Sequence, residues 1–323
     1  MSDHLQSLII KRKNMNILIF GGGGFIGSAI VDRLLLDGHE LTVFERPRVE
    51  SFRPFNNTEK VTWVTGDILS QNDISNAMQN IELVIHLVST TLPKSSNEDP
   101  IYDVQSNLVG TLQILNTMCN MGIKRIVFIS SGGTVYGPPE YTPIDEKHQC
   151  RPQVSYGITK QAIENYLLLY KKTHSIQPII LRVSNPYGKR QRVETAQGAA
   201  SVFINRAVRQ MPIEIWGDGS ITRDFIYIDD VAEAFSLAVN YSGIYDIFNI
   251  SSGVGTSLNE LMVEIESTLN CKVDKHYKAA RMCDVPVSVL SNQLAYQELG
   301  WQPKVSLRMG IEYTAKWMRQ QLS

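Results

Sequence analysis

The chain has 323 residues, of which 43% are hydrophobic; this is enough for one or two globular domains and too many for a disordered protein. Its 31 Lys and Arg balance 32 Asp and Glu, and a net charge of −1 gives no indication of nucleic acid or an anionic membrane as a partner. The four cysteines form no CxxC pair and no zinc-like cluster with the six histidines, so we expect reduced thiols, no metal site and a cytoplasmic protein.

Residues 1–14 look like an extension that precedes the folded protein. The basic residues Lys11 to Lys13 precede an uncharged run from Asn14 to Val31, an order that resembles a signal peptide. The run is interrupted by the glycines of residues 21–27 and lacks the roughly 20 predominantly apolar residues that a membrane span needs. A buried strand followed by a glycine-rich turn explains the same residues better, so we expect no membrane segment.

Short apolar runs alternate with helical patterns from Asn16 onward. Several of the runs are continuous in Val, Ile and Leu, which is typical of parallel strands covered on both faces. Alternation of this kind predicts an α/β protein with a doubly wound parallel sheet of the Rossmann type. The expected strands are 17–20, 40–44, 61–64, 83–88, 125–129 and 178–183, with helices between them, for example over 27–37 and 104–121.

The pattern becomes irregular after Asn185. We therefore expect the sheet domain to span residues 15–188, and a smaller C-terminal α/β lobe, the candidate substrate-binding part, to fill most of 189–323. Residues 224–252 contain a helical pattern and a further apolar run, and we expect them to return to the first domain.

A glycine-rich segment, GGGGFIG, runs from Gly21 to Gly27, directly after the first predicted strand and at the start of the first predicted helix. Gly21 would make the tight turn, Gly24 would let the backbone approach a pyrophosphate, and Gly27 would let helix and strand pack closely. The helix N-terminus, at Phe25 and Ile26, would then face the negative phosphates. The segment predicts a dinucleotide site, although a glycine-rich turn without a ligand has the same sequence.

Acidic residues follow the second and third predicted strands. Glu45 closes the second strand, where a carboxylate can accept hydrogen bonds from the adenosine ribose and repel a 2′-phosphate, which favours NAD over NADP. The neighbouring Arg46 weakens that preference. Asp67, followed by Ile68, ends the third strand within reach of an adenine, but an Asp after a Gly is equally common in ordinary loops.

Tyr156 and Lys160 form a YxxxK pattern on a predicted helix. Positions i and i+4 share one helix face, so the ammonium would lie near the phenol. A tyrosine has a pKa of ~10, and it acts as a base near neutral pH only if its phenolate is stabilised. A lysine and the positive ring of NAD⁺ would both stabilise it. With 13 tyrosines in the chain, the pattern alone also arises by chance.

Several motifs follow one another in a characteristic order. They are GGGGFIG, Glu45, Gly66-Asp67, SSGGTVYG over 130–137, Tyr156xxxLys160, NPYG over 185–188, RDFIYIDD over 223–230 and RMCD over 281–284. Together they resemble the extended short-chain dehydrogenases/reductases, and within them the NAD-dependent nucleotide-sugar epimerase/dehydratase family that UDP-glucose 4-epimerase typifies. The resemblance extends from Met15 to the C-terminus. It implies a Rossmann fold, NAD as the cofactor and a nucleotide-diphosphate sugar as the substrate.

The resemblance also implies roles for individual residues. Tyr156 and Lys160 would be catalytic and would contact the cofactor, together with the glycine-rich segment, Glu45, Arg46, Asp67, Ile68, Leu87, Val88, Ser89, Asn107 and Ser130. The substrate would be held by Ser131, Gly132, Asn185, Trp216, Arg223, Arg281, Asp284 and Ser288. An arginine suits this task because its planar fork binds phosphate oxygens in pairs.

One position departs from the family pattern. Gly132 stands where the family has a Ser or Thr whose hydroxyl bonds the reacting sugar oxygen, so Ser131, Thr134 or a water would have to supply that bond. We expect a serine at position 132 to be tolerated. Gly133 and Thr134 replace the acidic pair of the 4,6-dehydratases, which disfavours dehydration. Ser288 lies where a bulky residue excludes N-acetyl groups in the family, so a larger sugar should fit; the alternative is that Ser288 is a loop residue that faces solvent.

The leading hypothesis is epimerisation at C4 of a nucleotide-diphosphate hexose, which can extend to an N-acetylhexosamine. Tyr156, kept anionic by Lys160, would take the proton of the 4-hydroxyl while NAD takes the hydride, and the 4-keto sugar would turn over before the hydride returns. The alternative is an NAD(P)H-dependent reductase of a 4-keto-6-deoxy nucleotide sugar, which shares these motifs. A non-catalytic NAD-binding sensor is a third hypothesis. The family commonly forms homodimers through two helices, here near 104–121 and 155–172.

Overall fold

The computed structural model describes residues 14–192, 198–280 and 285–322. Its centre is a seven-stranded parallel sheet in the order β10-β6-β5-β4-β1-β2-β3. The order runs outward from β1 in both directions, as in a doubly wound sheet, so the predicted fold class is confirmed. The strands are β1 (Asn16–Phe20), β2 (Glu40–Glu45), β3 (Val61–Thr65), β4 (Leu83–His86), β5 (Arg125–Ser131), β6 (Gln177–Val183) and β10 (Ile247–Ile250).

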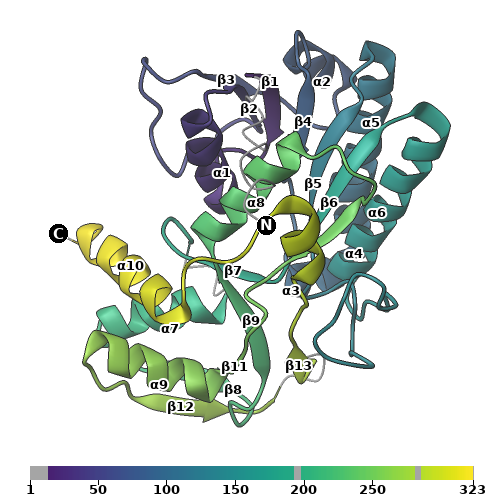
Figure 1. Cartoon of the computed structure of the whole chain (residues 1–323). Coiled ribbons are helices and arrows are strands. Elements are labelled where there is room, and N and C mark those ends of the chain that lie inside the picture. Colours follow the sequence, from purple (N-terminus) through teal and green to yellow (C-terminus); the bar gives the residue numbers. More distant parts are fainter. Residues whose placement is uncertain (1–13, 193–197, 281–284, 323) are drawn as a thin grey trace, which may run out of the picture.

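Helices cover both faces of this sheet, as Figure 1 shows. Ile17 and Ile19 of β1 are buried in one hydrophobic cluster, while Leu18 and Phe20, which point to the opposite face, are buried in another. Because neither face meets water, the strands need no alternation of polar and apolar residues. One face packs on α1 (Phe25–Leu36) and α8 (Ile228–Asn240), and the other on α2 (Gln71–Ala77), α5 (Gly110–Met121) and α6 (Ser155–His174).

Two smaller sheets and three helices form the lower part of the molecule in Figure 1. One sheet contains β7 (Asn185–Tyr187), β9 (Thr222–Tyr227), β11 (Gly255–Ser257) and β13 (Val287–Ser288). The other pairs β8 (Ile213–Trp216) with β12 (Lys275–Lys278). The helices of this part are α7 (Ala199–Val208), α9 (Leu258–Leu269) and α10 (Leu307–Gln320).

Residues 224–252 connect the two parts. The strand β9 pairs with β7 in the smaller sheet, where Phe225 is the partner of Asn185. The helix α8 then packs on α1, and β10 pairs with β6 at the edge of the large sheet, where Ile247 is the partner of Ile180. The chain thus contributes to the small sheet before it returns to the large one.

The segments that follow β4 differ from the sequence-based expectation. The strand predicted over 83–88 ends at His86, because the chain then turns toward α3 (Pro93–Glu98) and α4 (Pro100–Asp103). The helix predicted over 104–121 begins as one π-helical stretch, η1 (Val104–Val109), before α5 starts. Such stretches are frequent at functional sites, and this one carries Asn107.

Candidate active site

The glycine-rich turn joins β1 to α1 at the carboxyl edge of the sheet. Gly21 has φ +84°, a left-handed conformation that favours glycine, and its N–H donates to the carbonyl oxygen of Phe44 at 3.0 Å. At Gly27 a Cβ atom would overlap the carbonyl oxygen of Gly21. Gly24 is the N-cap of α1 and offers no side-chain cap, so the first N–H groups of the helix remain available to an anion. These observations fit a dinucleotide pyrophosphate.

Glu45, at the end of β2, lies beside this turn. Its Oε1 accepts a hydrogen bond from the N–H of Gly23 at 2.8 Å, so the carboxylate supports the turn. Burial raises the pKa of Glu45 above its usual value, while the Gly23 N–H and the charge of Arg46 oppose the shift. Asp67 is exposed and accepts from the N–H of Leu69, as a loop residue does.

We expect Glu45→Ala to weaken NAD binding and to reduce the discrimination against NADP, because the ribose loses an acceptor and a 2′-phosphate loses a repelling charge. Titration of NAD-depleted protein with both dinucleotides measures the change. Glu40→Ala is the control, because Glu40 is exposed and lies at the opposite end of the same strand. It should leave both affinities unchanged. An unaltered NAD/NADP ratio in Glu45→Ala would show that this carboxylate does not face the ribose.

Tyr156 and Lys160 lie on the first turns of α6 and are brought together as the sequence predicts. The Lys160 Nζ lies 5.7 Å from the centroid of the Tyr156 ring and donates to the carbonyl oxygen of Ile129 at 3.0 Å. Burial raises the pKa of Tyr156 to about 12, although a hydrogen bond with Ser89 opposes the shift. Burial also lowers the pKa of Lys160 to about 8, against the charges of Glu164 and Asp103. The phenol therefore needs further positive charge nearby before it can act as a base at neutral pH.

Two residues assigned to the cofactor are buried behind this pair and bond other protein groups. Ser130 is 3% exposed, and its Oγ donates to Oε1 of Glu164 at 2.5 Å. Asn107 is 4% exposed, and its Oδ1 accepts from the N–H of Thr90 at 2.9 Å. The loop after β4 lies closer to the turn, since a Cβ atom built on Gly21 would be 3.3 Å from the backbone nitrogen of Val88 and 3.4 Å from the carbonyl carbon of Leu87.

Three of the residues assigned to the substrate, Asn185, Arg223 and Ser288, lie on β9 or on strands paired with it. Arg223 is half-buried, and its guanidinium donates to the carbonyl oxygen of Val285 at 2.6 Å. Ser288 on β13 is its register partner and is buried, so it is not a solvent-facing loop residue. Asn185 donates from Nδ2 to the carbonyl oxygen of Asp224 at 3.0 Å. Ser131 ends β5, Trp216 ends β8 and is 40% exposed, while Arg281 and Asp284 lie outside the described residues.

The space beside Gly132 is filled by Leu290, contrary to the expectation that a serine fits there. A Cβ atom at position 132 would overlap Cδ1 of Leu290 and lie 3.1 Å from the carbonyl oxygen of Arg182. Leu290 is fully buried, with Val135, Tyr136 and Ile144 in the same cluster. Sequence alone could not show this, because the two residues are distant in the chain. The position where the family has a Ser or Thr hydroxyl is therefore occupied here by the apolar side chain of Leu290.

We expect Gly132→Ser to destabilise the protein by about 1–3 kcal/mol, the usual cost of overpacking a buried site. Gly133→Ser is the matched control, because a Cβ atom there has its nearest neighbour, Oδ1 of Asn185, at 3.8 Å. The cost of the serine at 132 should shrink when Leu290 is replaced by Ala. Chemical denaturation of Gly132→Ser, Leu290→Ala and the double variant measures this coupling. If the two losses of stability simply add, the contact between positions 132 and 290 is refuted.

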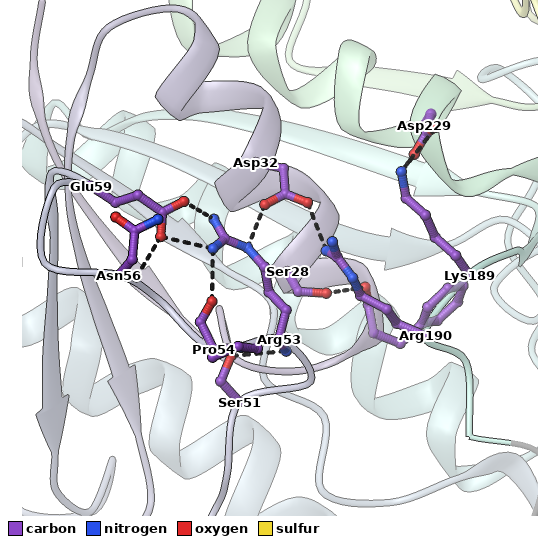
Figure 2. Close-up of polar contacts among 11 residues, drawn as sticks. Ser28, Asp32, Ser51, Arg53, Pro54, Asn56, Glu59, Lys189, Arg190 and Asp229 are labelled. Atoms are coloured by element: carbon purple, nitrogen blue, oxygen red, sulfur yellow. Dashed lines mark hydrogen bonds and ion pairs between the residues drawn. The ribbon is translucent and has the colours of Figure 1, made fainter. Parts of the chain in front are cut away.

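Two ion-pair clusters were not indicated by the sequence. Asp32 of α1 joins two loops, with Oδ1 at 2.6 Å from Nε of Arg53 and Oδ2 at 2.7 Å from NH1 of Arg190, as Figure 2 shows. Inside the protein, NH2 of Arg182 lies 2.6 Å from Oε2 of Glu164. In each cluster the partners come from distant segments, so no local pattern could reveal them. The first holds the loop between β2 and β3 against α1, and the second lies next to Lys160 on α6.

The described part of the chain brings no three His, Cys, Asp or Glu side chains into a group that would suit a metal ion. Within the same ranges, none of the helices combines the length and the apolar character that crossing a bilayer requires.

Residues 17–251 match the NAD dependent epimerase/dehydratase family. The chain belongs to that family. A putative UDP-glucose 4-epimerase of Methanocaldococcus jannaschii is 37% identical over 304 residues, which cover 94% of this chain and 98% of the relative. A dTDP-4-dehydro-6-deoxyglucose reductase of Escherichia coli is 34% identical over 314 residues, which cover 95% and 98%.

Among solved structures, the UDP-glucose 4-epimerase of Thermotoga maritima with UDP-glucose aligns with a TM-score of 0.91 and 32% identity, over 96% of this chain and 100% of that one. The predicted family, the predicted NAD cofactor and the predicted enzyme class, an NAD-dependent nucleotide-sugar epimerase, are thereby confirmed.

Proposed function

We propose that the chain interconverts C4 epimers of a nucleotide-diphosphate hexose, with Tyr156 as the base. The observation that carries the proposal is the Tyr156–Lys160 pair on α6, a half-buried tyrosine beside a buried lysine, at the same sheet edge as the dinucleotide turn. NAD, when bound, supplies a hydride acceptor that returns what it takes, so the reaction has no net redox change. The large sheet would hold NAD, and the smaller sheets would hold the sugar nucleotide.

The protein residues would move one proton and orient the sugar. The Tyr156 oxygen would take the proton of the 4-hydroxyl. It would give the proton back to the oxygen of the 4-keto sugar as the hydride returns, which forms the opposite epimer. Lys160, held by the carbonyl oxygen of Ile129, would stabilise the phenolate through its positive charge. Arg223 lies on β9 of the smaller sheet, and its guanidinium would suit the diphosphate.

A reductase of a 4-keto-6-deoxy nucleotide sugar is the second candidate. It is favoured by the 34% identity with the dTDP-4-dehydro-6-deoxyglucose reductase of Escherichia coli. A reductase consumes one NAD(P)H per turnover, whereas an epimerase leaves the nicotinamide absorbance unchanged at steady state. Mass analysis of the dinucleotide released on denaturation, followed by NMR of the products formed from UDP- and dTDP-sugars, separates the two. A protein that holds NAD and converts none of these sugars would be a sensor.

The site should accept a UDP-N-acetylhexosamine at least as well as UDP-glucose or UDP-galactose. Ser288 is small and is the register partner of Arg223. We expect a bulky side chain at this position to meet the C2 substituent of the sugar. We expect Ser288→Tyr to lower turnover of the acetylated sugar much more than that of the plain hexose, because a steric block excludes the larger ligand selectively.

Val287→Tyr is the matched control for this gate. Val287 precedes Ser288 on β13 and is 37% exposed, so its side chain points to the other face of the strand. The control should leave the ratio of the two activities unchanged. An equal loss on both sugars in Ser288→Tyr, or a parent enzyme inactive on acetylated sugars, would refute the gate.

We also propose a homodimer formed through η1, α5 and α6. Several large apolar side chains on α4, η1 and α6 are exposed, and a second copy of this face would cover them. Sedimentation equilibrium tests the dimer, and the mass of one chain would show that this surface has another use. The residues are Ile101, Tyr102, Val104, Val109, Ile158, Tyr166 and Leu169.

A further inference from the structure

Asp103 is a fully buried carboxylate at the end of α4, and none of the roles assigned above uses it. Its Oδ1 accepts hydrogen bonds from Oγ1 of Thr91 and, at 2.9 Å, from Nδ2 of Asn107. Its Oδ2 accepts from Oγ of Ser155 at 2.9 Å and from Oγ1 of Thr159 at 2.7 Å. Four donors thus satisfy a carboxylate that would otherwise be costly to bury.

Two of these donors bracket the catalytic tyrosine. Ser155 precedes Tyr156 and Thr159 follows it by almost one helical turn, so both hydroxyls tie the first turn of α6 to the carboxylate. The first N–H groups of α6 are held from α3: Oδ1 of Asn97 accepts from Ser155 at 2.8 Å, and Oγ of Ser96 accepts from Tyr156 at 3.0 Å. Side chains of α3 therefore hold two of the backbone N–H groups at the end of α6 that carries the phenol.

The other two donors connect Asp103 to the loop after β4. Asn107 holds that loop through its Oδ1, which accepts from the N–H of Thr90 at 2.9 Å. The same loop contains Ser89, whose hydroxyl bonds the Tyr156 phenol. One carboxylate consequently links the turn that carries the phenol with the loop that supplies its hydrogen-bond partner.

The charge of Asp103 also acts on the catalytic pair. It raises the pKa of Tyr156 and that of Lys160, each time as a smaller contribution than burial. The other groups that face the pair are Glu164, one turn further along α6 and paired with Arg182 of β6, and His86 of β4. Burial, with the charge of Lys160, lowers the pKa of His86 to about 3, so His86 is neutral at working pH.

We propose that Asp103 is a positioning residue for the reaction, which fixes the first turn of α6 against Asn107 and the loop after β4 and places a negative charge next to the Tyr156–Lys160 pair. The proposal rests on the function proposed above, in which Tyr156 is the base. It assigns to Asp103 an effect on both the rate and the pH dependence of turnover. If the carboxylate had only a packing role, its replacement would change the rate and leave the pH dependence as it is.

Asp103→Asn is the informative variant. It keeps the size of the side chain, and the hydroxyls of Ser155 and Thr159 can reverse their bonds and accept from the new amide, so the NAD-loaded protein should still fold. We expect kcat to fall by about 10- to 100-fold with little change in KM, because a small misplacement of a reacting group has a large effect on rate. The acidic limb of the kcat–pH profile should move to lower pH, because a phenol relieved of a nearby negative charge ionises more easily.

Two further variants separate geometry from charge. Thr159→Val removes one donor and keeps the carboxylate, so kcat should fall by about tenfold while the acidic limb stays in place. Asp99→Asn is the matched control: Asp99 is an exposed carboxylate at the start of α4 whose Oδ1 accepts from the N–H of Tyr102 at 2.9 Å, and Asn caps a helix equally well. It should leave both kcat and the pH profile unchanged.

The outcomes distinguish this proposal from the one on which it rests. If the parent protein interconverts no nucleotide sugar, the proposed function fails first. If the parent is active, wild-type kcat in either Asp103→Asn or Thr159→Val overturns the role of Asp103. The role is also overturned if folded, NAD-loaded Asp103→Asn has a lower kcat but the acidic limb of its kcat–pH profile stays in place or moves to higher pH. Should Asp103→Asn not fold, the rate of Thr159→Val decides alone.

Discussion

Replacing Tyr156 with Phe should lower kcat for C4 epimerisation by about 10²- to 10⁴-fold, which is the usual contribution of a general acid–base group. The substitution removes only the phenol oxygen, which Ser89 bonds, and leaves the ring beside the Lys160 ammonium. We therefore expect the fold and the NAD content to be retained. Steady-state kinetics, a melting curve and the amount of NAD released on denaturation test the three parts of this result.

Tyr166→Phe makes the same chemical change on an exposed side chain of α6 and should keep the parent kcat. In the parent, kcat should rise with pH, because burial raises the pKa of Tyr156 and only the deprotonated phenol takes a proton. Near-parental turnover in Tyr156→Phe would refute the assignment of the base.

The large sheet and the tyrosine–lysine pair could be predicted because their signals are local. Strands such as β1 are covered on both faces, which leaves a continuous apolar run in the sequence. The turn from Gly21 to Gly27 is a short segment in which Gly21 has a positive φ and a Cβ atom at Gly27 would overlap backbone atoms. Tyr156 and Lys160 are one helical turn apart, so their proximity follows from the helix alone.

The rest of the site depends on contacts between distant segments. Leu290 fills the space beside Gly132, and nothing near either residue indicates the other. The role of Asp103 could not be predicted in this way, because three of its four donors lie in the loop after β4 and in α6. Ser288 could be placed only by a family resemblance, and its burial on β13 became visible with the pairing of β13 and β9.

Gly27 and Gly24 require glycine for different reasons, and an alanine at each position should separate them. A Cβ atom at Gly27 would overlap the carbonyl oxygen of Gly21 and lie 2.6 Å from Cα of Gly22. Both are backbone atoms, which move only if the turn opens. We expect Gly27→Ala to destabilise the protein by at least ~1–3 kcal/mol and to lose NAD at the same time, because the same turn is needed for both.

Gly24 meets no such obstacle within the protein. A Cβ atom there has its nearest neighbour, the carbonyl oxygen of Gly21, at 3.7 Å, and its φ of −77° suits any residue. Gly24→Ala should therefore keep the melting temperature of the NAD-free protein and weaken NAD by about tenfold or more, or 1.4 kcal/mol, because the new methyl group stands where the backbone approaches the pyrophosphate. Calorimetric titration of NAD-depleted protein, beside melting curves of both variants, measures the difference. Parental NAD affinity in Gly24→Ala would place the pyrophosphate away from this turn, whereas a loss of stability equal to that of Gly27→Ala would show that both glycines serve packing alone.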